Sequence, residues 1–254
     1  MKIPSLQYYH IAEGLTAFSS MRQGGYSEGR YGEFNINRYC GDSDEAIRKN
    51  REALCHLLGI TDNHLLMPHQ IHQAEIAVID GQSDIDLEGY DALMTNMEDV
   101  CIGVSTADCI PVLLYDQKQR AICAVHAGWR GTVMRIVEQS IARMTEVYGT
   151  NPADLIAQIG PGIHLESFEV GDEVYEAFMK AGFDMERISR RDEKWHIDLP
   201  ECNRLQLMEA GIPEHQISVS PVCTFQQFDT FFSARRLGID SGRIFTGIIL
   251  RRRD

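Results

Sequence analysis

Three residues with metal-binding or nucleophilic side chains stand at the ends of apolar segments. Cys109 begins the run "CIPVLLYD", and His126 lies at the end of the run "AICAVHA". His72 precedes "EIAVI" in the segment "HQIHQAEI", three residues after His69. Two imidazoles and a thiolate suit zinc, with a fourth position left for water or substrate. The same residues could instead form a cysteine–histidine hydrolytic pair with a spare histidine, and spacing alone does not separate the two sites.

The segments around these residues predict the strands that would hold them. Residues 110–115 and 121–127 are continuously apolar and joined by the polar turn "DQKQR", which predicts a buried β-hairpin. Cys109 lies at the edge of the first strand beside the charged Asp108, and His126 lies where the second strand gives way to "AGWRG" and a helix. Side chains at such junctions face a cleft more often than the core. We therefore expect a core in the strand bodies and a site at their ends.

The rest of the chain predicts an α/β (α+β) protein with antiparallel or mixed strand pairing, because many adjacent strands are mixed with helices. No repeat or linker divides the sequence, so residues 1–254 are expected to form one domain. A long polar, glycine-rich loop or hairpin is predicted at 21–44. Apolar spacing and terminal glycines predict helices at 44–58, 132–148, 172–181 and 200–210. Further strands are predicted at 75–79, 92–96, 101–106, 155–160, 217–222 and 244–250.

Composition and charge exclude several classes of function. A formal net charge of -13 argues against nucleic-acid binding, because no positive field would attract a phosphate polymer. No stretch is long enough for a membrane span, and the N-terminus lacks the features of a signal peptide. Seven scattered cysteines are typical of reduced thiols, so a cytoplasmic protein is expected. Heptad repeats are absent, and the sequence predicts no oligomeric state.

Two features could bind an anion. A helix starting at Thr132 would direct free backbone N–H groups toward the space beyond His126, with Arg130 beside it. The segments "MRQGGYS" and "FFSARRLGIDSGR" present arginine among glycine and serine, a composition typical of phosphate-contacting loops.

A series of segments between residues 22 and 243 resembles the laccase-domain family, also described as multicopper polyphenol oxidase or YfiH-type proteins. They are "RQGGYS", "FNIN", "NRE", "HQIH", "DALMTN", "IGVSTADCIPVLLYD", "AVHAGWRGT", "IGPGI" and "CTF…FFSARR…GR". The resemblance implies a single α/β domain in layered α-β-β-α form with mixed sheets. It also implies a zinc site on His72, Cys109 and His126, with copper as the other possible metal. Gln73 replaces the small residue that usually follows the first histidine, so packing there is expected to differ, and His69 receives no role.

The function that the resemblance implies is purine nucleoside chemistry. Adenosine, inosine, guanosine and methylthioadenosine would undergo phosphorolysis, and adenosine would also be deaminated, so the partners are purine nucleosides and phosphate. Water activated by zinc could attack C6 of adenine. Asp108 would orient a metal ligand or handle a proton. The resulting catalytic residues are His72, Asp108, Cys109 and His126, and the phosphate-binding candidates are Arg22, Arg130 and Arg235.

Three alternatives accompany this interpretation. In the first, Cys109 is the nucleophile and His126 the base of a hydrolase that edits peptidoglycan precursors carrying a wrong amino acid. In the second, the protein is a copper polyphenol oxidase. That is disfavoured, because multicopper oxidases need many histidines in HxH pairs, whereas this chain has nine and no HxH. A single His₂Cys site could hold one copper of the electron-transfer type. In the third, the metal is structural, although structural zinc normally has four protein ligands.

Overall fold

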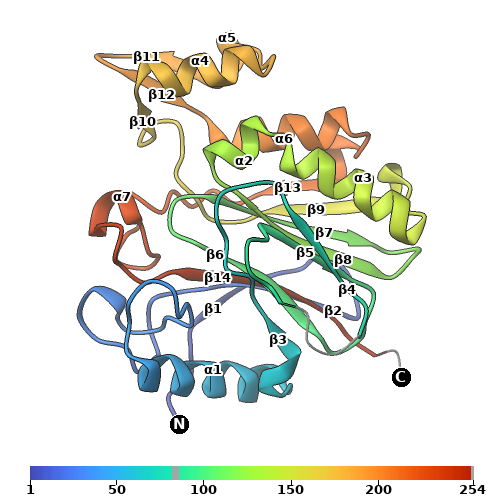
Figure 1. Ribbon diagram of the computed structural model, residues 1–254, viewed down its shortest axis with the longest axis vertical. Coiled ribbons are helices and arrows are strands. Elements are labelled where there is room, and N and C mark those ends of the chain that lie inside the picture. Colours follow the sequence, from blue (N-terminus) through green and yellow to red (C-terminus); the bar gives the residue numbers. More distant parts are fainter. Residues whose placement is uncertain (82–85, 253–254) are drawn as a thin grey trace.

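Two β-sheets lie face to face in the middle of the protein, and helices cover their outer faces (Figure 1). The structure is a computed structural model that describes residues 1–81 and 86–252. Within these ranges the strands form two large sheets and one small one, and both large sheets are mixed. The predicted layered α-β-β-α arrangement is confirmed.

The first sheet contains the first and the last strand of the described residues. Its order is β1 (Leu6–Tyr9), β2 (Leu15–Ser20), β14 (Ile244–Leu250), β6 (Cys101–Thr106) and β3 (Leu65–Leu66). Strand β3 runs parallel to β6, and the other neighbours are antiparallel. No strand was predicted at β1 or β2.

The second sheet carries the predicted hairpin at its centre. Its order is β13 (Ile217–Val219), β9 (Leu155–Ile159), β7 (Ile110–Asp116), β8 (Ala121–Ala127), β5 (Ala92–Thr95) and β4 (Ile76–Ile79). Strands β7 and β8 pair antiparallel, with Ile110 opposite Ala127 and Pro111 opposite His126. The predicted hairpin is therefore confirmed, and its register places Cys109 and His126 at the same end.

Apolar side chains fill the space on both sides of this central hairpin. On β7, Leu113 and Tyr115 pack between the two sheets, whereas Val112 and Leu114 pack under the helices. Successive strand residues point to opposite faces, so a strand that is covered on both faces needs apolar residues throughout. This explains the continuous apolar runs, and every residue of β7 and β8 is buried.

The helices on the outer faces begin and end where their capping residues stand. Helix α1 (Asp44–Leu58) covers the first sheet; the Ser43 hydroxyl accepts a hydrogen bond from the amide of Ala46, and Gly59 ends the helix at φ 66°. Helices α3 (Ile136–Tyr148) and α6 (Leu199–Glu209) pack on the second sheet. None of the helices in the described ranges combines the length and apolar character needed to cross a bilayer.

The helix predicted at 132–148 is wrong at its N-terminal end. The chain forms α2 (Trp129–Val133) and then α3, and the two are separated at Arg135, whose φ is 62°. Tertiary contacts hold this arginine in the left-handed region. Its guanidinium donates to Glu209 and to the carbonyl of Ala181, and it stacks 4.1 Å from the Phe183 ring centroid. These partners lie far along the chain, so helical periodicity could not reveal the break.

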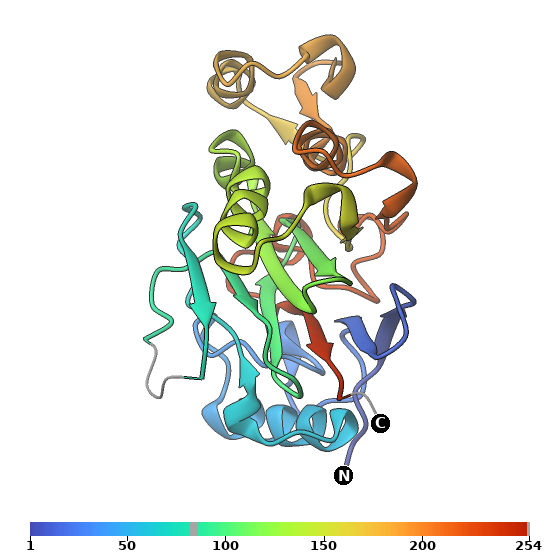
Figure 2. The same cartoon turned by 90° about the vertical axis from the view of Figure 1, so that its right-hand side faces the viewer.

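Residues 169–198 form a small unit at the end of the molecule opposite α1 (Figure 2). It contains β10 (Glu169–Val170), α4 (Asp172–Lys180), α5 (Met185–Ile188), β11 (Ser189–Arg191) and β12 (Trp195–Ile197). Only α4 was predicted. The remaining short elements are α7 (Ala234–Leu237) and 3₁₀ turns at Gly29–Tyr31, Asp62–His64, Pro152–Asp154 and Glu214–Gln216.

Candidate metal centre and its cavity

The structure brings His72, Cys109 and His126 together, and their ligand atoms all lie within 4.8 Å of one another. The Cys109 Sγ is 3.9 Å from Nε2 of His72. The two imidazoles meet edge to face, with ring centroids 4.8 Å apart. His126 is buried, Cys109 half-buried and His72 exposed, so an ion held by the three would keep one side open.

The donor set fits a single metal ion of the zinc type. Bonds of about 2.0–2.3 Å in a tetrahedral site separate ligand atoms by roughly 3.4–3.7 Å. The spacing between the Cys109 Sγ and the His72 Nε2 is 3.9 Å, so a small inward movement would complete the set. Three protein ligands and an open position are typical of catalytic rather than structural zinc.

Asp91 orients both histidines, and sequence reasoning missed it. Its fully buried carboxylate accepts a hydrogen bond from Nδ1 of His126 at 2.7 Å. It also accepts the backbone amides of His72 at 3.0 Å and Gln73 at 2.7 Å. Because Nδ1 of His126 donates to Asp91, Nε2 remains the atom available to a metal. The signal that could have identified Asp91 in the sequence is its place directly before the buried strand "ALMT".

Charge interactions shift the pKa values of this cluster. Burial raises the pKa of the Cys109 thiol. The charge of His126 and hydrogen bonds from both histidines outweigh this effect of burial and lower the pKa to about 6. Burial lowers the pKa of His126, but the Cys109 thiolate and Asp91 raise it to about 9. For Asp91, burial opposes ionisation, yet His126 and the two backbone amides hold the pKa below its usual range. The two histidines thus favour the thiolate form of Cys109, which is the form that binds metals.

Asp108 contacts the loops around the site rather than the three ligands. Its backbone has φ 87°, in the left-handed region. Its carboxylate accepts hydrogen bonds from the Thr224 hydroxyl and the Arg235 amide, both at 2.7 Å. These two bonds hold the turn that presents Cys109 against the segments around Thr224 and α7.

Gly128 lies against the metal ligands, where a side chain would collide with them. A Cβ at this position would lie 3.0 Å from Sγ of Cys109 and 3.1 Å from Cδ2 of His72. We expect Gly128→Ala to weaken metal binding by roughly tenfold, the effect of an overpacking cost of about 1–3 kcal/mol. Titration of the metal-stripped protein with zinc against a chromophoric chelator measures this affinity.

Gly149→Ala is the matched control for this substitution. Gly149 has φ +72° and no atom within 4 Å of an added Cβ, so alanine adds backbone strain without a steric contact. It should lower stability by about 1 kcal/mol and leave the metal affinity unchanged. Equal metal affinities for Gly128→Ala and wild type would show that the contact distances at Gly128 do not constrain the site.

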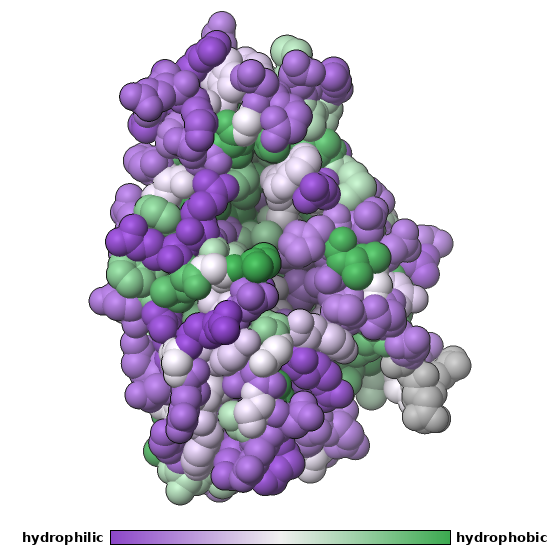
Figure 3. All heavy atoms as spheres, turned by 60° about the vertical axis from the view of Figure 1, so that its left-hand side comes forward, coloured by the Kyte–Doolittle hydropathy of each residue, from purple (hydrophilic) through white to green (hydrophobic). Residues whose placement is uncertain are grey.

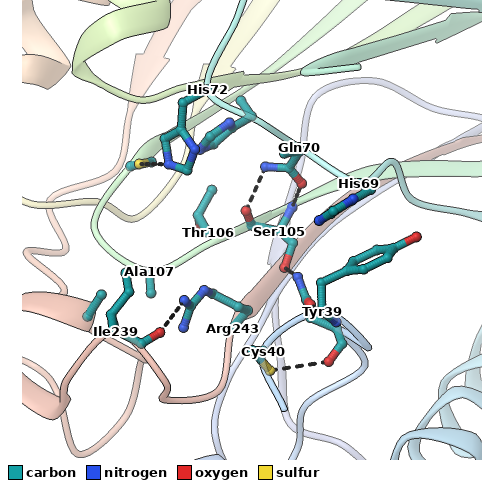
Figure 4. A pocket seen from close by; sticks show the side chains of 14 residues that line it. Tyr39, Cys40, His69, Gln70, His72, Ser105, Thr106, Ala107, Ile239 and Arg243 are labelled. Carbon is teal, nitrogen blue, oxygen red and sulfur yellow. Dashed lines mark hydrogen bonds between the residues drawn. The ribbon is translucent and has the colours of Figure 1, made fainter. Parts of the chain in front are cut away.

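The three ligands open into a cavity of about 180 Å³. Figure 3 views the molecule from the side of α7 and shows hydrophobic side chains flanking a hollow in a mostly hydrophilic face. Besides the three ligands, the lining residues are Asn37, Tyr39, Cys40, His69, Gln70, Ser105, Thr106, Ala107, Ala234, Ile239 and Arg243 (Figure 4). His69, which had no predicted role, stacks on Tyr39 with ring centroids 3.9 Å apart.

The three predicted phosphate-binding arginines do not line this cavity. The Arg22 guanidinium donates to the carbonyls of Gly32 and Phe228. Arg130 is exposed and stacks on the neighbouring Trp129. Arg235 donates to the carbonyl of Glu169 and lines a second pocket, which shares Ala234 and Ile239 with this cavity. Their binding of phosphate stays a prediction. The predicted helix start at Thr132 is wrong, since α2 begins at Trp129, and α2 is too short to provide much of the expected dipole.

Comparison with known proteins places this chain in a family. The sequence model described as "Multi-copper polyphenol oxidoreductase laccase" matches residues 16–251. The chain is 47% identical to a Bacteroides thetaiotaomicron protein named purine nucleoside phosphorylase, over 94% of this chain and 92% of the relative. It is 42% identical to a protein named adenosine deaminase RL5 from an unknown prokaryotic organism, over 98% of each.

Solved structures agree with these sequence matches. YlmD from Geobacillus stearothermophilus superposes with a TM-score of 0.90 at 27% identity, covering 99% of this chain and 100% of that one. Bacillus licheniformis YfiH gives 0.89 at 28% identity, covering 96% and 99%. The chain is an enzyme that belongs to the multi-copper polyphenol oxidoreductase laccase family, in its YfiH-type branch.

Proposed function

We propose that this enzyme is a zinc-dependent purine nucleoside phosphorylase that also deaminates adenosine. The observation that carries the proposal is the His72–Cys109–His126 cluster, open on one side toward a cavity. The names of the relatives at 47% and 42% identity support the two reactions. Adenosine, inosine, guanosine and methylthioadenosine are the proposed substrates of phosphorolysis.

Both reactions exchange one bond at the nucleoside. In phosphorolysis, a phosphate oxygen bonds to C1′ of the ribose as the C1′–N9 bond breaks, and the purine leaves with a proton. In deamination, water adds at C6 of adenine and ammonia leaves. Zinc held by the three ligands would supply Lewis acidity at physiological pH. The chain itself fixes the ligands through Asp91 and holds the Cys109 turn through Asp108.

The name of the family describes a different reaction, oxidation of phenols by several coppers. Among the described residues, only one group of three or more histidine, cysteine or acidic side chains could hold a metal ion. A His₂Cys site of this kind suits a single ion. The geometry therefore supports nucleoside chemistry over reduction of dioxygen by four electrons.

The products formed with and without phosphate test the proposal. Metal analysis of the purified protein should give about one zinc per chain, as expected for a single His₂Cys site. Adenosine should yield adenine and ribose-1-phosphate only when phosphate is present. Inosine should also form when phosphate is absent, because deamination does not use phosphate. Removing the metal with a chelator should stop both reactions, and added zinc should restore them.

Two outcomes would contradict this function. Full turnover by the metal-stripped protein would exclude the metal mechanism. Inactivity toward nucleosides, combined with release of an amino acid from a UDP-linked muropeptide, would favour the editing hydrolase. The short distance between the Cys109 sulfur and the His126 ring, within 4.8 Å, is the observation that keeps this second function a candidate. Oxygen uptake with a phenol and added copper tests the oxidase activity.

A further inference from the structure

The cavity at the three candidate ligands (the metal cavity) is small for a whole nucleoside. Its volume is about 180 Å³, whereas sites for small molecules usually measure roughly 300–1,000 Å³. The second pocket, of about 360 Å³, shares Ala234 and Ile239 with it, so the two lie side by side. Part of a nucleoside that reacts at the metal is therefore expected to lie outside the metal cavity, and the second pocket can receive it. Its other lining residues are Asp108, Ile163, Phe168 and Arg235.

The two charged residues of the second pocket are bonded to the protein. The Asp108 carboxylate accepts hydrogen bonds from the Thr224 hydroxyl and the backbone amide of Arg235. The Arg235 guanidinium donates to the carbonyl of Glu169, and its Cζ lies 5.6 Å from the ring centroid of Phe168. Opposite charges in one pocket leave little net field for an ionic group. The remaining lining side chains are all apolar.

Ile239 presents the largest exposed surface among these apolar side chains. It is 74% exposed, whereas Ile163 and Phe168 are buried. The Arg243 guanidinium fixes the loop that carries it, because it donates to the carbonyl of Ile239 and to two further carbonyls of the loop. Figure 4 shows Ile239 at the edge of the metal cavity, next to Arg243. An apolar side chain held in water at the border of two pockets is stabilised when an apolar group covers it.

Deamination determines which end of the substrate lies at the metal. Water activated by the metal must reach C6 of adenine, so C6 would lie at the open side of His72, Cys109 and His126. The 5′ carbon of the ribose is at the opposite end of adenosine from C6. The 5′ end therefore points away from the metal, toward the space beyond the metal cavity.

We propose that the second pocket binds the 5′ end of the nucleoside and that Ile239 selects apolar 5′ substituents. This inference rests on the proposed function, because deamination places C6 at the metal. The preferred substrates are 5′-methylthioadenosine and other 5′-alkylthioadenosines, whose substituents would lie against Ile239 and Ala234. Adenosine would turn its polar 5′ hydroxyl toward this apolar surface, and AMP would bring its phosphate toward the Asp108 carboxylate.

Deamination of a series of 5′-substituted adenosines tests this subsite. The substituent is remote from C6, so it changes binding and leaves the reactivity of the attacked carbon unaltered. In wild type, kcat/KM should rise from adenosine to 5′-methylthioadenosine. It should then rise by about fourfold with each methylene in the ethylthio and propylthio compounds, which is the gain from one buried methylene. A flat series overturns the apolar subsite, and so does a preference for AMP over 5′-methylthioadenosine, which would indicate an anion bound by Arg235.

Substitution of Ile239 tests whether this residue causes the preference. The readout is the ratio of kcat/KM for 5′-propylthioadenosine to kcat/KM for adenosine within each variant, because general structural damage lowers both values together. Ile239→Ser should lower this ratio by about tenfold, and Ile239→Leu should keep it. The matched control is Ile3→Ser, since Ile3 is 70% exposed and lines neither pocket. An unchanged ratio in Ile239→Ser, or an equal fall in Ile3→Ser, overturns the role of Ile239.

Failure of the subsite is distinguishable from failure of the proposed function. If wild type deaminates every compound of the series with the same kcat/KM, the function stands and the subsite alone is overturned. If wild type converts no nucleoside, the proposed function fails, and calorimetric titration with the same compounds tests the pocket. An affinity that rises with chain length in wild type and not in Ile239→Ser then supports an apolar binding pocket, and absence of this rise overturns it.

Discussion

Replacing Cys109 with alanine is expected to remove the bound metal and to reduce both nucleoside reactions below about 1% of wild type. Loss of groups that merely orient metal ligands costs 10–100-fold in affinity or activity, and loss of a ligand should cost at least as much. Cys109 also supplies the only negative charge among the three ligands, with a thiol pKa of about 6. Metal content by elemental analysis and product formation from adenosine with and without phosphate measure the two effects.

Two further variants identify the cause of the loss. Cys55→Ala changes a buried cysteine of α1, outside the site, and should retain metal and activity. His72→Ala separates metal chemistry from a cysteine–histidine hydrolase, because a hydrolase would need Cys109 and His126 only. We expect His72→Ala to lose metal and turnover as Cys109→Ala does. An active, metal-free His72→Ala enzyme would refute the metal centre.

Asp91→Asn is expected to weaken metal binding by about 10–100-fold, although the residue touches no metal. The carboxylate accepts hydrogen bonds from His126 and from the amides of His72 and Gln73, so its two oxygens face only donors. An asparagine would turn an NH₂ group toward one of these donors. Either the His126 ring reverses its tautomer or an amide loses its partner, and both changes disturb the ligand geometry. Competition with a chromophoric chelator measures the affinity.

Asp116→Asn is the matched control, because Asp116 is also fully buried and accepts backbone amides. Its Oδ1 receives the N–H groups of Lys118 and Gln119 at 2.9 Å in the turn after β7, at the far end of the hairpin from Cys109. Asp116→Asn keeps one oxygen for these two amides and places its NH₂ group where the unpartnered Oδ2 stands, so it should leave the metal affinity unchanged. If both variants weaken zinc binding to the same extent, the loss of a buried carboxylate in itself, and not the orientation of the histidines, explains the behaviour of Asp91→Asn.

Local patterns in the sequence predicted the elements that form around a single stretch of chain. Helix α1 has the predicted bounds, because its apolar stripe, the preceding Ser43 and the following Gly59 all lie within one segment. The β7–β8 hairpin follows from two apolar runs joined by a polar turn. Strands β1 and β2 and the small sheet were not predicted, because they are short and their burial depends on distant partners.

Residue types and their places at strand ends were enough for the sequence by itself to locate His72, Cys109 and His126, the group that could hold a metal ion. Only the tertiary structure decided what surrounds them. Asp91, directly before β5, meets His72 at the bend before β4 and His126 on β8, which lie 19 and 35 positions away in the sequence. Side chains that act on a site from distant strands carry no local signal, because their proximity is fixed by register and sheet order rather than by spacing along the chain.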